Sequence, residues 1–404
     1  MMQFPRRILL TCLAVFLLLP TAIAAQTPSA SPAGSKNLQT LDIDGIPVAL
    51  SPDGTQIAGI KRDPAQLCVW DIASLESICS DTMPVPITQR SVVWSPDSTA
   101  VAFSLDAAIY IEDSDIYVLE TQSGITNNLT DDDPDDTGAD AISISRDNVN
   151  EVPLDVFPAW SPDSQQLVFA RTVWSTRADT GTKLMTISRN GGEPQKLVTL
   201  HRSMPFLVYS PMQWLQDGSI LVSTWHPRID DPLNSIRRVT PEGKVTDILS
   251  GHPEVGVPSA SIASVTADGS QASIYSYVML NQFGFEPGTV WFRMDTTTGA
   301  FEPWETVLGL ATEPTQALAS NGPGVLIAAP VFGPDDASVA FITRVGNGPV
   351  HVSIMDAQGT VSEIATIDPD TTDTTRYPAE PRISWASNNT LLVILPDTTV
   401  LMSL

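Results

Sequence analysis

The chain has 404 residues, 42% of them hydrophobic, with 46 Asp and Glu against 21 Lys and Arg. This hydrophobic share allows a large core, and 24 Gly with 33 Pro suit many short strands joined by turns. The formal net charge of −25 repels nucleic acid and anionic lipid, which excludes nucleic-acid binding as a function and leaves cations and basic partners open.

Residues 1–24 have the pattern of a secretory signal peptide. Arg6 and Arg7 form the basic start, residues 8–19 form an apolar run, and residues 22–24 supply the small Ala-Ile-Ala cleavage sequence. The run is too short to span a bilayer, and no later segment is apolar enough to do so. We therefore expect a secreted, extracytoplasmic protein without a membrane span after processing, whose net charge falls from −25 to −27 when the two arginines are removed.

The mature chain is expected to begin with a flexible linker at 25–36, followed by one domain at 37–404. Within that domain, Cys68 and Cys79 lie in the runs LCVWDI and ESICS, which read as two strands of a hairpin. A symmetric turn near residues 73 and 74 places the two thiols opposite each other, within reach of a disulfide. An oxidising compartment favours that bond over the alternative of two buried free thiols.

One pattern recurs seven times along the chain, about every 56 residues, and predicts a β-propeller. Each copy has a large apolar residue, a turn with Pro and then Asp or Asn, a Gly or a substitute for it, and a second strand. Third and fourth strands follow, so each copy forms a four-stranded antiparallel blade. The copies are LSPDGTQIAG from Leu50, WSPDSTAVAF from Trp94, WSPDSQQLVF from Trp160, WLQDGSILVS from Trp214, VTADGSQASI from Val265, FGPDDASVAF from Phe332 and WASNNTLLVI from Trp385.

The two ends of the domain support a closed ring. The last copy provides strands at TLLVIL and TVLMSL and then stops at Leu404, so its fourth strand is missing. A spare strand, Leu38 to Ile43, precedes the first copy and can complete the last blade, which closes the ring. We expect an all-β protein with seven blades; six is the alternative if one weak copy is an insertion.

The string W-S-P-D-G/S at Trp94 and Trp160, followed by strands such as IYVLE, resembles the WD-like repeat of the TolB family. The same repeat builds the propellers of dipeptidyl peptidase and prolyl oligopeptidase relatives. The resemblance implies a propeller that associates with other molecules outside the cytoplasm. We find neither a segment similar to the N-terminal domain of TolB nor a G-x-S-x-G nucleophile sequence of a hydrolase domain.

Candidate site residues are expected on one face of the propeller. The loops between second and third strands and those between blades share that face, and several of them are long. A ligand is expected at the mouth of the central channel, where five residues flank the inner strands: Arg90, Asp155, Gln213, Glu380 and Arg382. The alternative is that these residues are ordinary polar strand ends.

A metal site is a second hypothesis for the same face. His201, His226 and His252 fall in loops of neighbouring blades, with Asp230 close in sequence, and imidazole with carboxylate suits zinc. The alternative is a set of solvated loop histidines. The acidic stretch from Asp131 to Asp140 has oxygen ligands for calcium but does not fit the calcium-loop pattern, which favours a solvated loop.

The sequence therefore favours a monomeric, non-enzymatic module that binds an extracytoplasmic protein or a small ligand without a cofactor. The alternative is a metal-assisted propeller hydrolase or lyase that uses the loop face of blades 3–5. Zinc at the histidines, or calcium at the acidic stretch, is the alternative to the absence of a cofactor.

Overall fold

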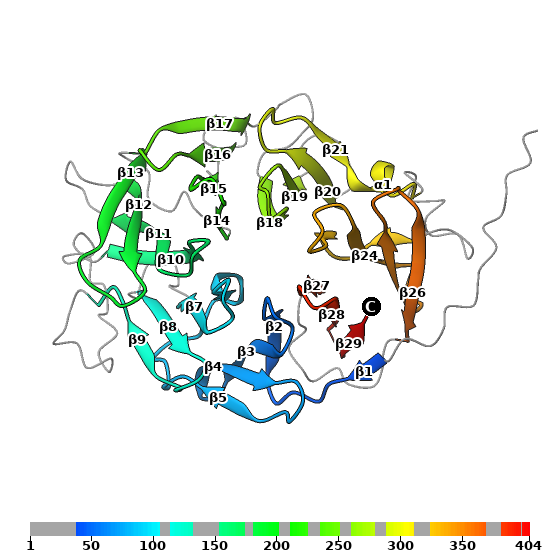
Figure 1. The fold of residues 1–404 in the computed structure, drawn as a ribbon, viewed down its shortest axis with the longest axis horizontal. Coiled ribbons are helices and arrows are strands. Elements are labelled where there is room, and N and C mark those ends of the chain that lie inside the picture. The colour runs from blue at the N-terminus through cyan, green and yellow to red at the C-terminus, as the bar shows by residue number, and fades with distance from the viewer. Residues whose placement is uncertain are drawn as a thin grey trace, which may run out of the picture. The chain divides into compact units, whose positions relative to one another are not determined.

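The computed structural model describes residues 38–105, 114–131, 153–173, 181–201, 211–224, 235–250, 260–278, 288–310, 324–368, 381–396 and 398–404. The expected signal peptide and linker lie outside these residues. The described strands form seven separate antiparallel sheets that follow one another around a ring (Figure 1). The expectation of a seven-bladed, all-β propeller is confirmed, and the six-bladed alternative is wrong.

Blades 1 to 6 each run from an innermost strand to an outermost strand in chain order (Figure 1). Blades 1 to 3 contain β2 (Ile46–Leu50), β3 (Gln56–Arg62), β4 (Ala65–Asp71) and β5 (Ser77–Cys79); β6 (Val93–Trp94), β7 (Ala100–Ser104), β8 (Ile116–Glu120) and β9 (Thr126–Asn128); and β10 (Pro153–Trp160), β11 (Gln166–Val173), β12 (Gly181–Ser188) and β13 (Gln195–His201). Blades 4 and 5 contain β14 (Gln213–Trp214), β15 (Ile220–Thr224), β16 (Ser235–Val239) and β17 (Val245–Ser250), then β18 (Ala260–Val265), β19 (Gln271–Val278), β20 (Gly288–Asp295) and β21 (Phe301–Pro303).

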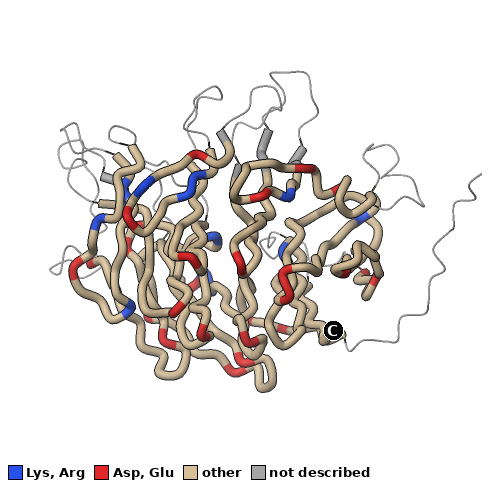
Figure 2. The backbone as a smooth tube through the Cα atoms, turned by 45° about the horizontal axis from the view of Figure 1, so that its top comes forward, with Lys and Arg blue, Asp and Glu red and all other residues tan. Residues whose placement is uncertain are grey.

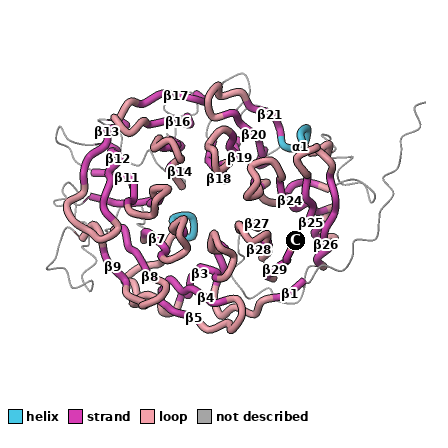
Figure 3. The backbone as a smooth tube through the Cα atoms, viewed as in Figure 1, coloured by secondary structure: helices cyan, strands magenta, loops and turns pink. Residues whose placement is uncertain are grey.

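Blade 6 departs from the four-stranded pattern because its inner strand is broken. Its strands are β22 (Val325–Leu326), β23 (Val331–Phe332), β24 (Val339–Arg344), β25 (Val350–Met355) and β26 (Val361–Ile367). Both β22 and β23 pair with β24, so they act as two halves of one inner strand. Among the described residues the helical segments are two short ones, η1 (Gln89–Ser91) and α1 (Trp304–Val307) (Figure 3). No helix in this part of the chain has the length and apolar character that a membrane crossing requires.

Blade 7 joins the two ends of the domain. It consists of β27 (Arg382–Trp385), β28 (Thr390–Ile394), β29 (Thr399–Ser403) and, as its outermost strand, β1 (Leu38–Thr40). Leu38 pairs with Met402 and Thr40 with Val400, and the Leu41 amide donates to the Thr399 carbonyl at 2.9 Å. The N-terminal strand therefore closes the ring, as the sequence predicted.

The repeated turn has the backbone geometry that its residues predict. The fourth turn position has a positive φ, between +57° and +80°, in all seven copies. Glycine adopts this left-handed conformation readily, whereas Asn, Asp and Ser adopt it at a cost in conformational energy. The residues are Gly54, Ser98, Ser164, Gly218, Gly269, Asp336 and Asn389.

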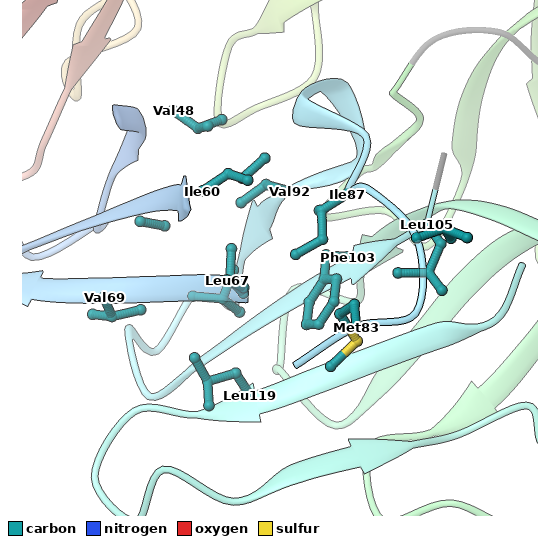
Figure 4. Packing of buried hydrophobic residues seen from close by; sticks show 13 residues of the cluster. Val48, Ile60, Leu67, Val69, Met83, Ile87, Val92, Phe103, Leu105 and Leu119 are labelled. Carbon is teal, nitrogen blue, oxygen red and sulfur yellow. The ribbon is translucent and has the colours of Figure 1, made fainter. Parts of the chain in front are cut away.

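Apolar packing joins each blade to the next. Seven clusters of buried hydrophobic residues are present in the described chain, and each draws side chains from two neighbouring blades. Between blades 1 and 2, for example, Ile60 and Leu67 meet Phe103 and Leu119 (Figure 4). A fully buried side chain of this size stabilises the fold by about 1.5–3 kcal/mol. The core is therefore a series of interfaces around the ring, and removing any blade exposes two of them.

The repeated tryptophans seal these interfaces. The Trp94 indole nitrogen of blade 2 donates to the Ala49 carbonyl of blade 1 at 3.2 Å. The Trp160 indole of blade 3 donates in the same way to Val93 of blade 2, also at 3.2 Å. These rings therefore link neighbouring blades and contribute to the fold.

Candidate ligand-binding site

The two faces of the propeller differ in how their polar groups are used. The repeated turns between first and second strands lie on one face, here called the turn face, and red segments at the lower edge of Figure 2 mark Asp and Glu positions there. The Asp of the first six turns, and Asn388 of the seventh, accept hydrogen bonds within the turn. In the third turn, the Ser161 hydroxyl donates to Asp163 at 2.6 Å and the Gln165 amide donates at 3.0 Å. These two bonds hold the pKa of Asp163 below its usual value. These turn carboxylates therefore help to stabilise the fold.

On the opposite face, here called the loop face, described residues line pockets. The first has a volume of about 630 Å³ and lies where blades 1, 2 and 7 meet. It is formed by the β3–β4 hairpin, by the segment 86–90 that leads into β6, and by the first residue of β27. Its described lining residues are Ile60, Lys61, Arg62, Ala65, Pro86, Ile87, Thr88, Gln89, Arg90 and Arg382.

Positive charge sets this pocket apart, and we call it the basic pocket. Lys61, Arg62, Arg90 and Arg382 are four of the 21 basic residues of the chain, and the described lining contains no carboxylate. The chain carries 46 acidic residues against 21 basic ones, so a lining with four basic side chains differs from its overall composition. Such a cavity can hold an anionic group by charge and by directed N–H bonds.

Arg90 is held from the other side of the ring. Its Nη1 donates to the Tyr275 hydroxyl of β19, in blade 5, at 3.0 Å. The guanidinium also lies over the Tyr275 ring, 5.9 Å from the centroid, and Trp291 packs against that ring at 5.4 Å. Blade 5 thus orients a side chain that lines a pocket between blades 1, 2 and 7.

The second pocket, of about 650 Å³, lies at the ring closure. It is lined by the segment after β1, by the β3–β4 hairpin and by the β28–β29 turn, and it shares Ile60, Lys61 and Arg62 with the basic pocket. Acidic residues also line it, and Asp44 forms an ion pair with Lys61 at 3.1 Å. The mixture of charges makes it a poorer anion site than the basic pocket.

The structure brings two of the five expected mouth residues into one site. Arg90 and Arg382, which are 292 positions apart, both line the basic pocket. Gln213 begins β14 and is among the described lining residues of neither pocket. Glu380 lies outside the described residues. Lys61 and Arg62 were missed, although their place at the end of β3, just before the turn into β4, is a signal that could have assigned them to the loop face.

Asp155 is buried in blade 3 and is absent from the described lining of both pockets. It is 1% exposed, and Arg171 on the neighbouring strand donates to both of its carboxylate oxygens, at 2.8 and 2.6 Å. Burial raises the pKa of Asp155 to about 6, and the bonds from Arg171 oppose that rise. The pair ties β10 to β11 and is structural.

The expected metal site cannot be assembled from the described residues. His201 ends β13 on the loop face, whereas His226, His252 and Asp230 lie outside the described residues. In the described ranges no group of three or more His, Cys, Asp or Glu is placed to hold a metal ion. Of the acidic stretch, Asp131 is described and residues 132–140 are not.

Cys68 and Cys79 form a disulfide between β4 and β5, with an S–S distance of 2.04 Å. The two residues are direct cross-strand partners. The bond fixes the outer edge of blade 1, whose β3–β4 hairpin supplies Lys61 and Arg62 to the basic pocket.

Comparison with known proteins shows the fold and nothing finer. No protein-family model and no curated protein sequence matches the chain. Similar solved structures include hydrazine synthase from Kuenenia stuttgartiensis, with 12% identity and a TM-score of 0.55 over 90% of this chain and 97% of that one. Oligogalacturonate lyase from Vibrio parahaemolyticus is 11% identical, with a TM-score of 0.54 over 91% of this chain and 97% of that one.

TolB from Acinetobacter baumannii is also a structural neighbour, as the repeat pattern predicted. It is 16% identical with a TM-score of 0.45, and the match covers 82% of this chain. The chain spans 65% of the length of that TolB. At these identities the likeness is one of propeller fold.

Proposed function

We propose that this chain is an exported, non-enzymatic propeller that binds an extracytoplasmic protein or small ligand at its loop face. The observation that carries the proposal is the basic pocket, a cavity of about 630 Å³ lined from three blades of a rigid ring. On the turn face, by contrast, the Asp carboxylates of the repeated turns accept hydrogen bonds within their own turns, which supports a role for them in the fold.

The signal pattern at residues 1–24 supports export, and the disulfide between Cys68 and Cys79 suits an oxidising compartment. The chain closes its own ring through β1, which supports action as a monomer. Mass spectrometry of the exported protein tests this part: a first residue at Ala25 supports it, and retention of residues 1–24 inside the cell overturns it.

Site-specific photo-cross-linking in intact cells tests the binding face. A photoreactive residue at Thr88, in the basic pocket, is compared with one at Thr55, in a turn on the turn face. We expect a defined adduct, with a protein or a small molecule, from position 88 and none from position 55. Adducts from position 55 alone, or from neither position, would overturn the proposal.

A metal-assisted hydrolase or lyase is a second candidate. It is favoured by His201 at the end of β13 on the loop face and by an oligogalacturonate lyase among the proteins of similar fold. Zinc content after reconstitution, measured for the parent and for His226→Ala, separates the two candidates. One bound zinc that is lost in the variant supports the enzyme, and zinc-free protein after reconstitution rejects it.

A further inference from the structure

We propose that the basic pocket binds a small organic anion through its carboxylate or phosphate oxygens. The inference deepens the proposed function and rests on it, because it gives the chemical class of the ligand at the same face.

Charge is the first support. Lys61, Arg62, Arg90 and Arg382 line one cavity whose described lining has no carboxylate, in a chain with more than twice as many acidic as basic residues. Lys61 also pairs with Asp44 at 3.1 Å, so the three arginines carry the proposal. An anion in the cavity can accept charge-assisted hydrogen bonds from more than one of these cations.

Donor geometry is the second support. Three of the four cations are arginines, whose planar guanidinium presents paired N–H donors that match the two oxygens of a carboxylate or phosphate. They reach the pocket from the β3–β4 hairpin, from the segment before β6 and from β27. Donors from three directions suit an anion with more than one charged group.

The remaining lining indicates an organic ligand and not a bare ion. Ile60, Ala65, Pro86 and Ile87 add apolar surface to the same pocket. A volume of about 630 Å³ falls in the range of small-molecule sites, roughly 300–1,000 Å³, and far exceeds one inorganic ion. The carbon skeleton of the anion therefore has a surface to contact.

Tyr275 acts as a positioning residue for this site. Its hydroxyl accepts a hydrogen bond from Arg90 Nη1 at 3.0 Å, and its ring lies beneath the guanidinium. The bond limits the directions in which Arg90 can point, so that less conformational entropy is lost when a ligand is bound. Removing the hydroxyl should therefore weaken binding without changing the net charge.

Isothermal titration of the purified mature chain with citrate, inorganic pyrophosphate and the uncharged polyol ribitol tests the proposal. We expect saturable binding of citrate, pyrophosphate or both, and none of ribitol; the two anions distinguish a carboxylate from a phosphate ligand. Arg90→Gln and Arg382→Gln should each weaken binding at least about tenfold, since each removes charge-assisted hydrogen bonds. Lys244→Gln, the same charge change at an exposed turn-face residue, should leave affinity within about twofold.

Tyr275→Phe gives a result that does not depend on the loss of charge. It should weaken anion binding by about threefold to tenfold, the effect of one lost hydrogen bond, while circular dichroism and the unfolding midpoint stay close to the parent. Absence of anion binding by the folded parent overturns the inference, as does binding that all three pocket variants retain. If position 88 still gives a cross-linked partner in cells, the proposed function survives that failure; if it gives none, both fall.

Discussion

Ring closure can be tested by two leucines that lie three residues apart. Leu38, in β1, is 48% exposed, whereas Leu41, directly after β1, is 5% exposed and packs in the cluster between blades 7 and 1. Leu41→Ala removes three buried carbons. At about 0.8 kcal/mol for each, plus the cavity that remains, the free energy of unfolding should fall by about 3 kcal/mol. Leu38→Ala should change it by about 0.5 kcal/mol or less.

Urea unfolding followed by tryptophan fluorescence measures both variants against the parent. The midpoint should move to clearly lower urea for Leu41→Ala with little change in the slope, and should stay in place for Leu38→Ala. Equal midpoints for the two variants would refute the packing of this segment between the first and last blades. A loss of stability in Leu38→Ala alone would show that Leu38, and not Leu41, is the residue of this segment that packs in the core.

Three further predictions concern the stability of the fold. Replacing Cys68 and Cys79 together by Ala should lower the free energy of unfolding by about 3 kcal/mol, because the disulfide closes a loop with a sequence separation of 11. An unchanged urea midpoint under non-reducing conditions contradicts this prediction. Arg189→Ala should lower the free energy of unfolding by about 2 kcal/mol in the same assay, because this side chain of blade 3, which is 13% exposed, donates to Glu120 of blade 2. An unchanged free energy of unfolding would count against this contact. The folded pKa of Asp155, about 6, exceeds its unfolded value of 3.8, so the folded state binds the proton more tightly. The resulting contribution to the free energy of unfolding, about 3 kcal/mol, is present below pH 4 and is lost as pH rises through 6. Asp155→Asn should therefore flatten the pH dependence of the melting temperature. An unaltered pH profile rejects the raised pKa of Asp155.

Most of the fold could be predicted because its determinants are local and repeated. Each copy combines an apolar strand end with a turn that requires a left-handed residue, and the structure has a positive φ at all seven of those positions. The pairing of Cys68 with Cys79 followed from one symmetric hairpin. The closure by β1 followed from counting strands in the last copy.

The role of Asp155 could not be predicted because a β-bulge changes the strand register. Trp160 pairs with Leu167 next to the turn, and continued without interruption this register would place Asp155 opposite Thr172. The register shifts between Val156 and Ala159, at Phe157 with its positive φ, and Asp155 faces Arg171 instead. A single extra residue thus turned an expected mouth residue into a buried ion pair.

The basic pocket could be predicted only in part. The repeat pattern assigns each residue to a strand or turn and so to a face, which was enough to select Arg90 and Arg382. It does not give the distance of a side chain from the ring axis or from the next blade. Lys61 and Arg62 line the pocket because the β3–β4 hairpin of blade 1 lies next to the segment before β6. That proximity is set by packing between blades 1 and 2, which the repeat pattern does not describe.

Hydrogen–deuterium exchange of the mature protein, with and without saturating citrate, tests most directly whether the loop-face pocket is the binding site. Binding there predicts slower exchange in the β3–β4 hairpin, residues 60–65, and in residues 86–90, with no change in the turns at 51–55 and 95–99. Protection confined to those turns, or none anywhere at saturating citrate, would contradict it.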